Sequence, residues 1–530
     1  MIDQYTGIDL AVFTLYLVIL LVSGYVFNRR AKNTQDYFLG GNSMSVWAVG
    51  ISVLATSQSA ATFLGGPDQG YRGDLTYLTT NIAGFIAALF VAKFLLPRFY
   101  ALKAFTVYEL LGNRFGENAK YQAGLVYLVG RLFASGARLF MAAIAVAMIL
   151  FGDVAPSSVA IAIAIITVVG FSYTVYGGIR SVIYSDVVQC VIYVGAAALV
   201  LGYLIQSIPL SMGEMFNLLD ASNAEQTSKL RFFDFSVDFS SAGVFNVWSI
   251  MTGFVLLNIA AFGLDQDVTQ RMLTCKDAKS ATKALISSII MGLPVVLVFV
   301  CIGLLLFIFY QRPDVMAQAT SGAPVPEFKG QTVTIFMYYV LTNLPNGIKA
   351  VVTIGILAAA LSTLNSGLNS MSSVAVQDIY RGWIKKGVTI SEQKLVAVGR
   401  ISMAIVAVSL GSVALLCYYW QQYTDTPLLA FALSVMVFSY SGLLGIYFTA
   451  LFSKRGSPKS IVTALMIGFA IPVLMQPYVQ SLYLPDALQF DLAFTWQLVV
   501  GTSVSWLICL SGNSQNLTPN NKLQETKNVA

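Results

Sequence analysis

The sequence predicts an all-α membrane protein with about 13 transmembrane helices. Hydrophobic residues make up 57% of its 530 residues and charged residues only 11%, whereas about a quarter of the residues in a soluble domain are charged. A helix that crosses the hydrocarbon core needs roughly 20 mostly apolar residues. The segments that meet this requirement have approximate bounds 9–28, 46–66, 76–98, 121–150, 156–176, 180–206, 243–266, 281–310, 347–375, 397–419, 427–452, 459–477 and 492–511.

These segments define a single transmembrane transporter domain over residues 1–511. The first segment is too long for a removable signal peptide, and it lacks a basic start and a cleavage site. Two long connections, 207–242 and 311–346, are expected to form lids over an external mouth. The apolar stretch 331–344 is too short to span and predicts a surface helix. The polar residues 512–530 predict a disordered cytoplasmic tail.

The net charge of +6 is explained by the connections that carry the cations. With the N-terminus outside, most Lys and Arg fall in connections predicted to be cytoplasmic, which is the positive-inside pattern. This pattern places the C-terminus in the cytoplasm and makes a nucleic-acid partner unnecessary. The predicted cytoplasmic cations are Arg29, Arg30, Lys32, Arg98, Lys103, Arg114, Lys120, Arg180, Arg271, Lys276, Lys279, Lys283, Arg381, Lys385, Lys386, Lys394, Lys454, Arg455 and Lys459, against Arg72, Lys229, Arg231, Arg312, Lys329 and Lys349 outside.

Residue types that are missing exclude several kinds of chemistry. The chain has no histidine, so a proton relay built on imidazole is excluded. A membrane-embedded enzyme would need a paired acid and base or a metal site at a cleft, and neither an enzyme nor an organic cofactor is expected. Ion coupling must rest on oxygen ligands or carboxylates. No disulfide framework or metal site is predicted, because CxxC spacing is lacking among Cys190, Cys275, Cys301, Cys417 and Cys509.

Two spans have the composition of interrupted helices. Residues 51–71 carry Ser, Thr, Gln and Gly in mid-span, and residues 255–271 carry one Asn and two Asp towards one end. Irregular backbone is tolerated in a membrane only where protein or a water-filled cavity surrounds it. The two spans open successive groups of five, about 46–206 and 243–452, as expected of inverted repeats with broken helices. Close helix packing through small residues is the alternative explanation.

Two segments offer the oxygen ligands that sodium prefers, without net charge. One is the interruption from Ala55 to Gln58, and the other is 357–370, LAAALSTLNSGLNS. Interhelical hydrogen bonding, worth about 1 kcal/mol per contact, is the alternative explanation for the second segment. Its polar side chains recur every three or four residues and so share one helix face: Ser362, Asn365, Ser366 and Asn369.

Three charged residues are expected inside spans, where charge is costly and indicates function. Asp186, about two turns into the sixth span, is a candidate carboxylate ligand for a cation. Arg131 and Arg138 lie seven residues apart in the fourth span and share a face. Arg131 is expected to reach the interface or to pair with a structural acid, whereas the deeper Arg138 is suited to gripping a carboxylate bidentately.

Five motifs, taken in order, resemble those of the sodium:solute symporter family. Any one of them alone would be weak, but together they span most of the chain. They are DYFLGG at 36–41, WAVGISVLATSQSAATFLG at 47–65, YTVYGGIRSVIYSDVVQ at 173–189, QDVTQR at 266–271 and LAAALSTLNSGLNSMSSVAVQDIY at 357–380.

The resemblance implies a LeuT-like fold, with two inverted five-helix repeats and sodium bound between the broken helix and the ninth span. The family's common sodium site would comprise three carbonyls and two hydroxyls, from Ala55, Gln58, Ala359, Ser362 and Thr363. The sialic acid carriers of the family have a second sodium site, which here would fall on Asp186, Ser362, Asn365 and Ser366. Asparagine stands at 365 where those carriers have serine, so the second ion is left open.

The same carriers imply positions for the solute. They use hydroxyls on the broken helix, an amide on the next span and an arginine for the carboxylate. The amide is asparagine here instead of glutamine, and the arginine is assigned by counting back from the end of its span, so the choice between Arg131 and Arg138 stays open. The matching positions are Ser57, Ser59, Thr62, Asn81 and Arg138.

The galactose carriers of the family match less well. Their sugar-binding asparagine corresponds to Asn258, and Phe262 is expected to cap the solute from the inner side. Their glutamate is Asn81 here, their gating tyrosine is Ala261, and their lysine near Pro294 is missing. These differences disfavour a plain hexose.

The sequence therefore predicts a sodium-coupled symporter of the bacterial inner membrane. It would import a small polar solute by alternating access, with a carboxylated sugar such as sialic acid preferred. A neutral sugar, a monocarboxylate or an amino acid remains open, as does a transporter-like channel or sensor. Sodium is the expected coupling ion, and the solute and membrane lipid are the expected partners. Neither a nucleic acid nor an obligate protein partner is inferred.

Overall fold

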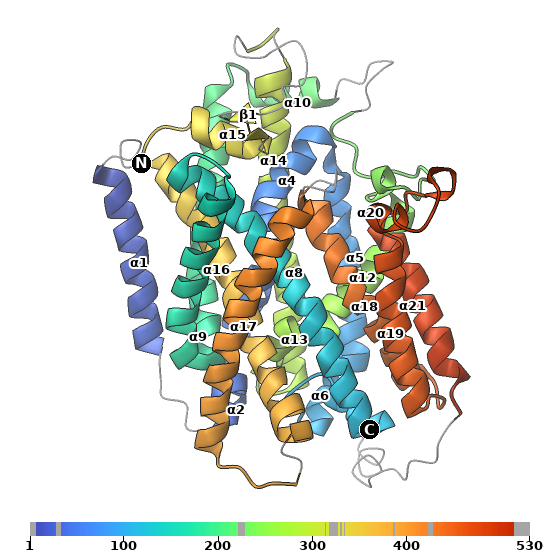
Figure 1. Cartoon of the computed structure of the whole chain (residues 1–530). Coiled ribbons are helices and arrows are strands. Elements are labelled where there is room, and N and C mark those ends of the chain that lie inside the picture. Colours follow the sequence, from blue (N-terminus) through green and yellow to red (C-terminus); the bar gives the residue numbers. More distant parts are fainter. Residues whose placement is uncertain are drawn as a thin grey trace.

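A computed structural model describes residues 7–27, 33–220, 228–312, 314–316, 327–328, 331–332, 334–384, 387–421 and 428–513. Long helices run side by side to form one bundle, and short helices and loops cover the end that is uppermost in Figure 1. The tail predicted from residue 512 lies outside the described residues from 514 onwards. The longer helices are α1 (Gly7–Phe27), α8 (Glu117–Phe151), α9 (Pro156–Ser207), α14 (Ala278–Gln311), α16 (Ile348–Val374), α17 (Glu392–Gln421), α18 (Leu428–Phe452), α19 (Pro458–Leu474) and α21 (Phe494–Ser511).

The described helices confirm a helical membrane protein. Eight of them are long and apolar enough to cross a membrane, or up to ten if each of two bent pairs forms one span. The helix α9 is 52 residues long and contains two predicted spans. Its helical dihedrals are interrupted at Gly178, where φ is 58°, and a Cβ there would lie 2.5 Å from the Tyr37 carbonyl oxygen. Glycine is the residue that adopts this conformation without strain.

Both predicted interruptions are present. The first divides α3 (Val46–Ser57) from α4 (Ala60–Arg72), and Gln58 between them is extended, with φ −85° and ψ 129°. The second divides α12 (Val255–Gly263) from α13 (Gln266–Leu273), with a bend of 51°. The first break lies at Gln58 and Ser59, at the end of the predicted interruption from Ala55 to Gln58, and Ala55 itself is still helical.

The remaining elements are short. The bend of 111° between α2 and α3 was not predicted. The other helical segments are α2 (Thr34–Leu39), η2 (Gly40–Asn42), η3 (Leu75–Thr79), α5 (Thr80–Phe90), η4 (Val91–Leu95), α6 (Leu96–Leu102), α7 (Glu109–Phe115), α10 (Met212–Asp220), η5 (Ser241–Gly243), α11 (Val247–Ser249), η6 (Ile250–Phe254), α15 (Ile335–Thr342), η7 (Ala375–Ile384), α20 (Pro477–Gln480) and η8 (Asp486–Leu488).

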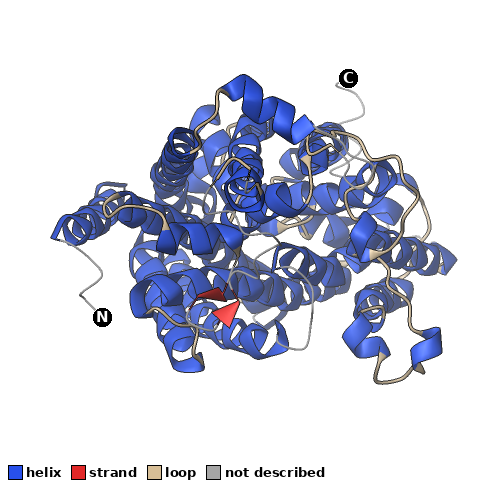
Figure 2. Cartoon of the chain, turned by 90° about the horizontal axis from the view of Figure 1, so that it is seen from above, coloured by secondary structure: helices blue, strands red, loops and turns tan. Residues whose placement is uncertain are grey.

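The fold is not entirely helical. Strands β1 (Glu327–Phe328) and β2 (Gln331–Thr332) form an antiparallel hairpin, and Figure 2 shows it above the helical bundle. Two-residue strands carry no hydrophobic periodicity, so the sequence pattern could not reveal them. The predicted surface helix within 331–344 is present as α15, whose apolar side chains are largely buried.

Burial divides the helices into central and peripheral ones. Most side chains of α8 and α16 are buried, including the hydroxyl and amide groups of α16. Only 33% of the apolar window of α17 is buried, as expected of a lipid-facing helix. The polar side chains of α16 therefore face the interior of the bundle, where other helices can satisfy them.

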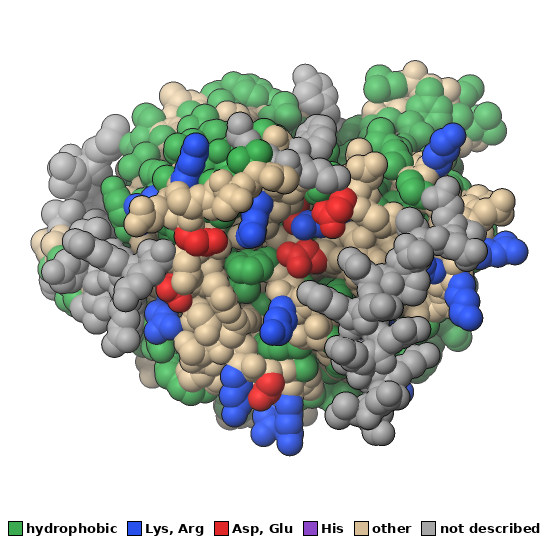
Figure 3. All heavy atoms as spheres, turned by 90° about the horizontal axis from the view of Figure 1, so that it is seen from below, with side chains coloured by type: hydrophobic (Ala, Val, Ile, Leu, Met, Phe, Trp, Pro, Cys, Tyr) green, Lys and Arg blue, Asp and Glu red, His purple; other side chains and the backbone are tan. Residues whose placement is uncertain are grey.

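One end of the bundle is rich in basic residues. Figure 3 shows Lys and Arg side chains spread over the face seen from below. Helix termini at this end carry exposed cations that were predicted to be cytoplasmic: Arg98, Lys103, Lys276, Lys279, Lys283, Lys394, Lys454, Arg455 and Lys459. Arg271 departs from that prediction, because it is fully buried in α13.

Candidate functional site

The first helix break places polar side chains in the middle of the bundle. The Ser57 hydroxyl donates to the Leu54 carbonyl over 2.8 Å, and Ser59 N–H lies 3.5 Å from the Thr62 hydroxyl oxygen. Serine side chains that bond the backbone in this way compete with helical hydrogen bonding. The break therefore follows from the local sequence, and it directs several hydroxyl groups towards the space between the helices.

The second break is stabilised by a carboxylate. The Asp265 side chain accepts a hydrogen bond of 2.9 Å from Asp267 N–H and caps α13. Aspartate favours such a position because its oxygen satisfies an N–H group that the first turn of a helix leaves free. Asp265 and Asp267 are both buried and line the same cavity as the first break.

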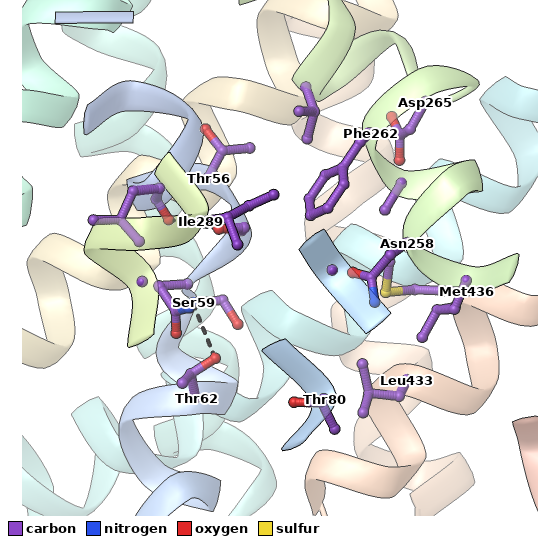
Figure 4. Close-up of a pocket in the computed structure, with 18 of the residues that line it drawn as sticks. Thr56, Ser59, Thr62, Thr80, Asn258, Phe262, Asp265, Ile289, Leu433 and Met436 are labelled. Atoms are coloured by element: carbon purple, nitrogen blue, oxygen red, sulfur yellow. Dashed lines mark hydrogen bonds between the residues drawn. The ribbon is translucent and has the colours of Figure 1, made fainter. Parts of the chain in front are cut away.

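That cavity, of about 180 Å³, lies between the two breaks. Figure 4 shows Ser59 and Thr62 on one wall, with Asn258 and Phe262 of α12 across the gap from them. All the residues predicted to contact the solute line it: Ser57, Ser59, Thr62, Asn81, Arg138, Asn258 and Phe262. The structure thus brings together side chains from five separate helices.

The two arginines of α8 differ sharply in their partners. Arg131 forms ion pairs with Asp265, over 2.7 Å, and with Asp267, and Tyr440 also donates to Asp265 over 2.5 Å. The Arg138 Nη2 instead lies 2.9 Å from the sulfur of Met436. No carboxylate of a described residue lies within 4 Å of the Arg138 guanidinium. The alternative in which Arg131 pairs with structural acids is confirmed, and Arg138 is left lining the cavity without an acid partner.

Arg271 connects the ion pairs of Arg131 with Asp265 and Asp267 to Asp186. Its Nη2 lies 3.0 Å from Asp186 Oδ2, and its Nη1 donates to the Asp267 carbonyl over 2.7 Å. Both Arg271 and Asp186 are fully buried. The prediction that Arg271 lies in a cytoplasmic connection is wrong because α13, bent by 51° from α12, packs against α3 and α16 inside the bundle, where two carboxylates offset the cost of burying the cation.

The two oxygen-rich segments predicted to bind sodium meet. The Thr56 and Ser366 hydroxyl oxygens are 3.2 Å apart, which joins the end of α3 to α16. On α16 the Thr363 hydroxyl donates to the Ala359 carbonyl over 3.1 Å, and on the first break Gln58 Oε1 is buried without a hydrogen-bond partner. Neutral oxygens of this kind fit a hard monovalent cation such as sodium. Among the described residues no cluster of His, Cys, Asp or Glu offers a site for a more strongly charged metal.

The side chains predicted to form the second sodium site are bonded to other side chains. Asp186 accepts hydrogen bonds from Ser52 at 2.5 Å and Ser362 at 2.8 Å in addition to its ion pair. The Arg271 guanidinium donates to Ser366 over 2.5 Å. The Asn365 amide nitrogen is bonded to the Tyr173 hydroxyl, and its oxygen is buried without a partner. A second sodium would therefore share Asp186 and Ser366 with a guanidinium.

Several residues of the site were not predicted. Tyr440 and Met436 lie on α18, outside every motif noted in the sequence, whereas Ser52 on α3 and Tyr173 on α9 lie within quoted motifs that gave them no role. Tyr77 lines both the central cavity and a larger outer cavity of about 410 Å³. The outer cavity is also lined by Arg72 and Arg231. From the sequence, these two residues were placed only as charges in external connections.

The two broken helices, with a polar cavity between them and charges enclosed by the bundle, define a membrane transporter rather than an enzyme. A model of the sodium:solute symporter family matches residues 37–468. The chain therefore belongs to the sodium:solute symporter family. It is a multi-pass membrane protein of a family that couples the transport of small solutes to sodium.

Curated relatives of the chain transport different solutes. It is 28% identical to the sodium/sialic acid symporter SiaT of Proteus mirabilis over 89% of this chain and 90% of that protein. It is 25% identical to the sodium/glucose cotransporter of Vibrio parahaemolyticus over 94% and 90%, respectively. For human sodium-coupled monocarboxylate transporter 2 the identity is 28%, over 73% of this chain and 60% of that protein.

Solved structures share the fold. A substrate-bound, outward-open sodium-coupled sialic acid symporter superposes with a TM-score of 0.79 at 24% identity, over 97% of this chain and all of that one. The nucleobase-cation-symport-1 transporter Mhp1, in a closed conformation with bromovinylhydantoin bound, gives a TM-score of 0.54 at 13% identity, over 92% and 98%, respectively. These likenesses establish the fold and leave the solute to be argued from the site.

The two arginines of α8 should differ in their effect on stability. Replacing Arg131 by Ala leaves Asp265 buried without its cation and Asp267 with Arg271 alone, which is expected to cost about 3–5 kcal/mol. Replacing Arg138 by Ala breaks no ion pair and should cost clearly less. Thermal unfolding of the purified full-length variants in detergent measures the difference, and equal losses of Tm would contradict the assignment of Arg131 as the structural arginine.

Proposed function

We propose that this chain imports a small hydroxylated acid, such as a sialic acid or a similar carboxylated sugar, together with sodium. The observation that carries the proposal is the Arg138 guanidinium, which lines the central cavity without a carboxylate partner among the described residues. A guanidinium binds a carboxylate bidentately. Hydroxyls of Ser57, Ser59 and Thr62 and the amides of Asn81 and Asn258 would bind the sugar, and Phe262 would cap it.

Charge balance supports an anionic solute accompanied by a cation. Arg131, Arg271 and Arg138 carry three positive charges, and Asp186, Asp265 and Asp267 carry three negative ones. The buried group is neutral as it stands. A carboxylate at Arg138 would leave it with a net negative charge, and one sodium nearby would restore neutrality. Each ligand should therefore improve the binding of the other, as linkage requires.

The proposed sodium site lies where the first broken helix, α3 with α4, meets α16. Its ligands would be oxygens of Ala55, Gln58, Ala359, Ser362 and Thr363, at the junction of α3 with α16. Sodium there would hold the broken helix against α16 and favour the state that opens outwards. One charge moving through 100 mV contributes about 2.3 kcal/mol. A monovalent acid imported with one sodium carries no net charge, whereas a second sodium, at Asp186, Ser362, Asn365 and Ser366, would make transport electrogenic.

The path from outside would pass through the outer cavity. Tyr77 lies between the two cavities, with its ring centroid 5.2 Å from that of Phe245. Ligand pockets usually have volumes of about 300–1,000 Å³, so the central cavity of about 180 Å³ is contracted. Alternating access would widen it by moving α4 and α12 about their breaks, with Tyr77 turning aside to admit the solute.

The full membrane topology also belongs to this proposal. The eight long helices become nine spans when α9 is divided at Gly178, and α1, α3 with α4, α12 with α13, and α19 bring the count to thirteen. Two five-span repeats, about 46–206 and 243–452, would each begin with a broken helix, within one transporter domain over 1–511. The basic face would lie in the cytoplasm of a bacterium, with the N-terminus outside the inner membrane.

A monocarboxylate is the second candidate solute. The same guanidinium would bind its carboxylate, and a relative at 28% identity is named as a monocarboxylate transporter. The several hydroxyl and amide groups in the cavity favour the larger hydroxylated acid. A neutral sugar has no carboxylate for Arg138 to bind, whereas an amino acid has one and stays an alternative solute. A channel would have no need of a solute cavity.

Uptake into proteoliposomes tests the proposed function. Radiolabelled sialic acid and a monocarboxylate should be compared, with sodium or potassium outside. We expect sodium-dependent uptake of the sialic acid, and a loss of at least about tenfold in apparent affinity on replacing Arg138 by Ala, because tenfold corresponds to only 1.4 kcal/mol. Equal uptake in the two salts would refute sodium coupling, and unchanged affinity in the variant would refute the role of Arg138.

The sodium site is tested by a matched pair of threonines on α16. Replacing Thr363 by Ala removes a proposed ligand and should raise the sodium concentration for half-maximal uptake several-fold. Thr353 is equally buried on the same helix, where its hydroxyl donates to the Lys349 carbonyl over 2.8 Å. Its replacement by Ala should leave sodium dependence unchanged. Indistinguishable sodium dependence of the two variants would rule out Thr363 as a ligand.

A further inference from the structure

An external segment, 231–239, exposes its apolar side chains more than its acids. The segment reads RFFDFSVDF. Phe235 is 67% exposed and Val237 70% exposed, and Phe233 and Phe239 are each about half exposed. Asp234 and Asp238 are less exposed, whereas Ser236 between them is exposed. This is the reverse of the pattern expected where an extended segment faces water.

Hydrogen bonds hold this segment against the start of the adjoining span. The Asp234 backbone carbonyl accepts from Val247 N–H over 2.8 Å, at the first residue of α11. The Asp238 backbone carbonyl accepts from the Asn246 side chain over 2.6 Å. The two carboxylates are bonded within the loop itself, because Asp234 accepts from Ser236 N–H over 3.0 Å and Asp238 accepts from Ser240 N–H over 2.8 Å.

A second external segment extends the apolar surface. Between α20 and α21, Leu482 is 83% exposed, and Tyr483, Leu488 and Phe490 are also exposed. The Ser241 hydroxyl donates to Asp491 over 2.6 Å, and Ala493 N–H donates to the Phe239 carbonyl over 2.8 Å. We call the exposed side chains of these two segments the aromatic edge: Phe232, Phe233, Phe235, Val237, Phe239, Leu482, Tyr483, Leu488 and Phe490.

The aromatic edge continues the surface that a bilayer would contact. Trp248 and Met251, at the start of the adjoining span, are both about half exposed. In Figure 1, α20 and its loops lie at the upper end of the bundle, above α21. Aromatic residues are enriched at the level of the lipid headgroups. A contiguous exposed apolar patch marks an interaction surface.

We propose that the aromatic edge inserts into the interfacial region of the outer leaflet. The continuity with lipid-facing residues of a span and the lower exposure of the aspartates fit a lipid surface. A second copy of this chain would instead call for free polar groups around the rim of the patch, and the carboxylates that could provide them are already bonded within the loop, Asp234 to Arg231 and Ser236 and Asp238 to Ser240.

Insertion would also position the first broken helix. Just before the aromatic edge, Lys229 Nζ donates to the carbonyls of Tyr71 and Gly73, each over 2.8 Å, at the end of α4. Arg231 forms an ion pair of 2.8 Å with Asp74. Burial lowers the pKa of Lys229 to about 8, which nearby Asp74 opposes. A loop anchored in lipid would thereby be fastened to the outer half of the helix that lines the solute cavity.

Spin labels at adjacent positions test the insertion. Phe235→Cys and Ser236→Cys are introduced separately into the full-length chain, with Cys301 replaced by Ala because the other four cysteines are buried. Each labelled protein is reconstituted into liposomes, and the accessibility of the label to oxygen and to a water-soluble nickel chelate is measured by electron paramagnetic resonance. Val237→Cys, on the same side as Phe235, replaces the first variant if that one does not fold.

The label at 235 or 237 should be more accessible to oxygen than to the nickel complex, and the label at 236 should show the reverse. Nickel accessibility that dominates at all positions would overturn the proposal, because the segment would then lie in water. Protection from both reagents, or dipolar broadening between labels, would also overturn it, because the patch would then contact a second copy of the chain.

Discussion

The ion-paired network of Arg131, Asp265, Asp267, Arg271 and Asp186 is the constraint on which the centre of this molecule depends. Five charges buried in the membrane are tolerable only because each guanidinium lies against carboxylates. The network joins α8, α9 and α13 and thereby fixes the second helix break at Asp265 and the helix that follows it. Arg131 is engaged in this network. Arg138, about two turns along the same face of α8, is therefore the cavity-lining arginine that remains for a ligand.

The network also explains why two ligands should bind together. With Arg138 included, the charges of the network and of this arginine sum to zero, and an anion or a cation bound alone disturbs that balance. In a medium of low effective dielectric constant such an imbalance is much more costly than in water. Coupling energies between sites of 1–3 kcal/mol, or factors of about 5 to 150 in affinity, are typical. Neutralisation of one ligand's charge by the other can supply an effect of this size without any direct contact between them.

The sequence was sufficient to predict the two helix breaks, but it was insufficient to predict which charged side chains pair with one another. Hydroxyl, amide and glycine residues within an apolar span predicted both breaks, because those side chains disfavour continuous helix locally. The choice between Arg131 and Arg138 could not be made from the chain, since seven residues place them on one face and the acids that distinguish them lie more than 130 positions away. Arg271 was misplaced for the same reason: its burial depends on how α13 turns after the break, which local composition does not determine.

Binding of the solute in the presence and absence of sodium tests the central claim most directly. Isothermal titration of a sialic acid into the full-length protein, in sodium or in potassium at equal ionic strength, gives the two dissociation constants. The account predicts clearly tighter binding in sodium, by a factor of at least about 5. Equal affinity in the two salts would show that sodium and solute do not stabilise one another, and would contradict coupling through the shared balance of charge.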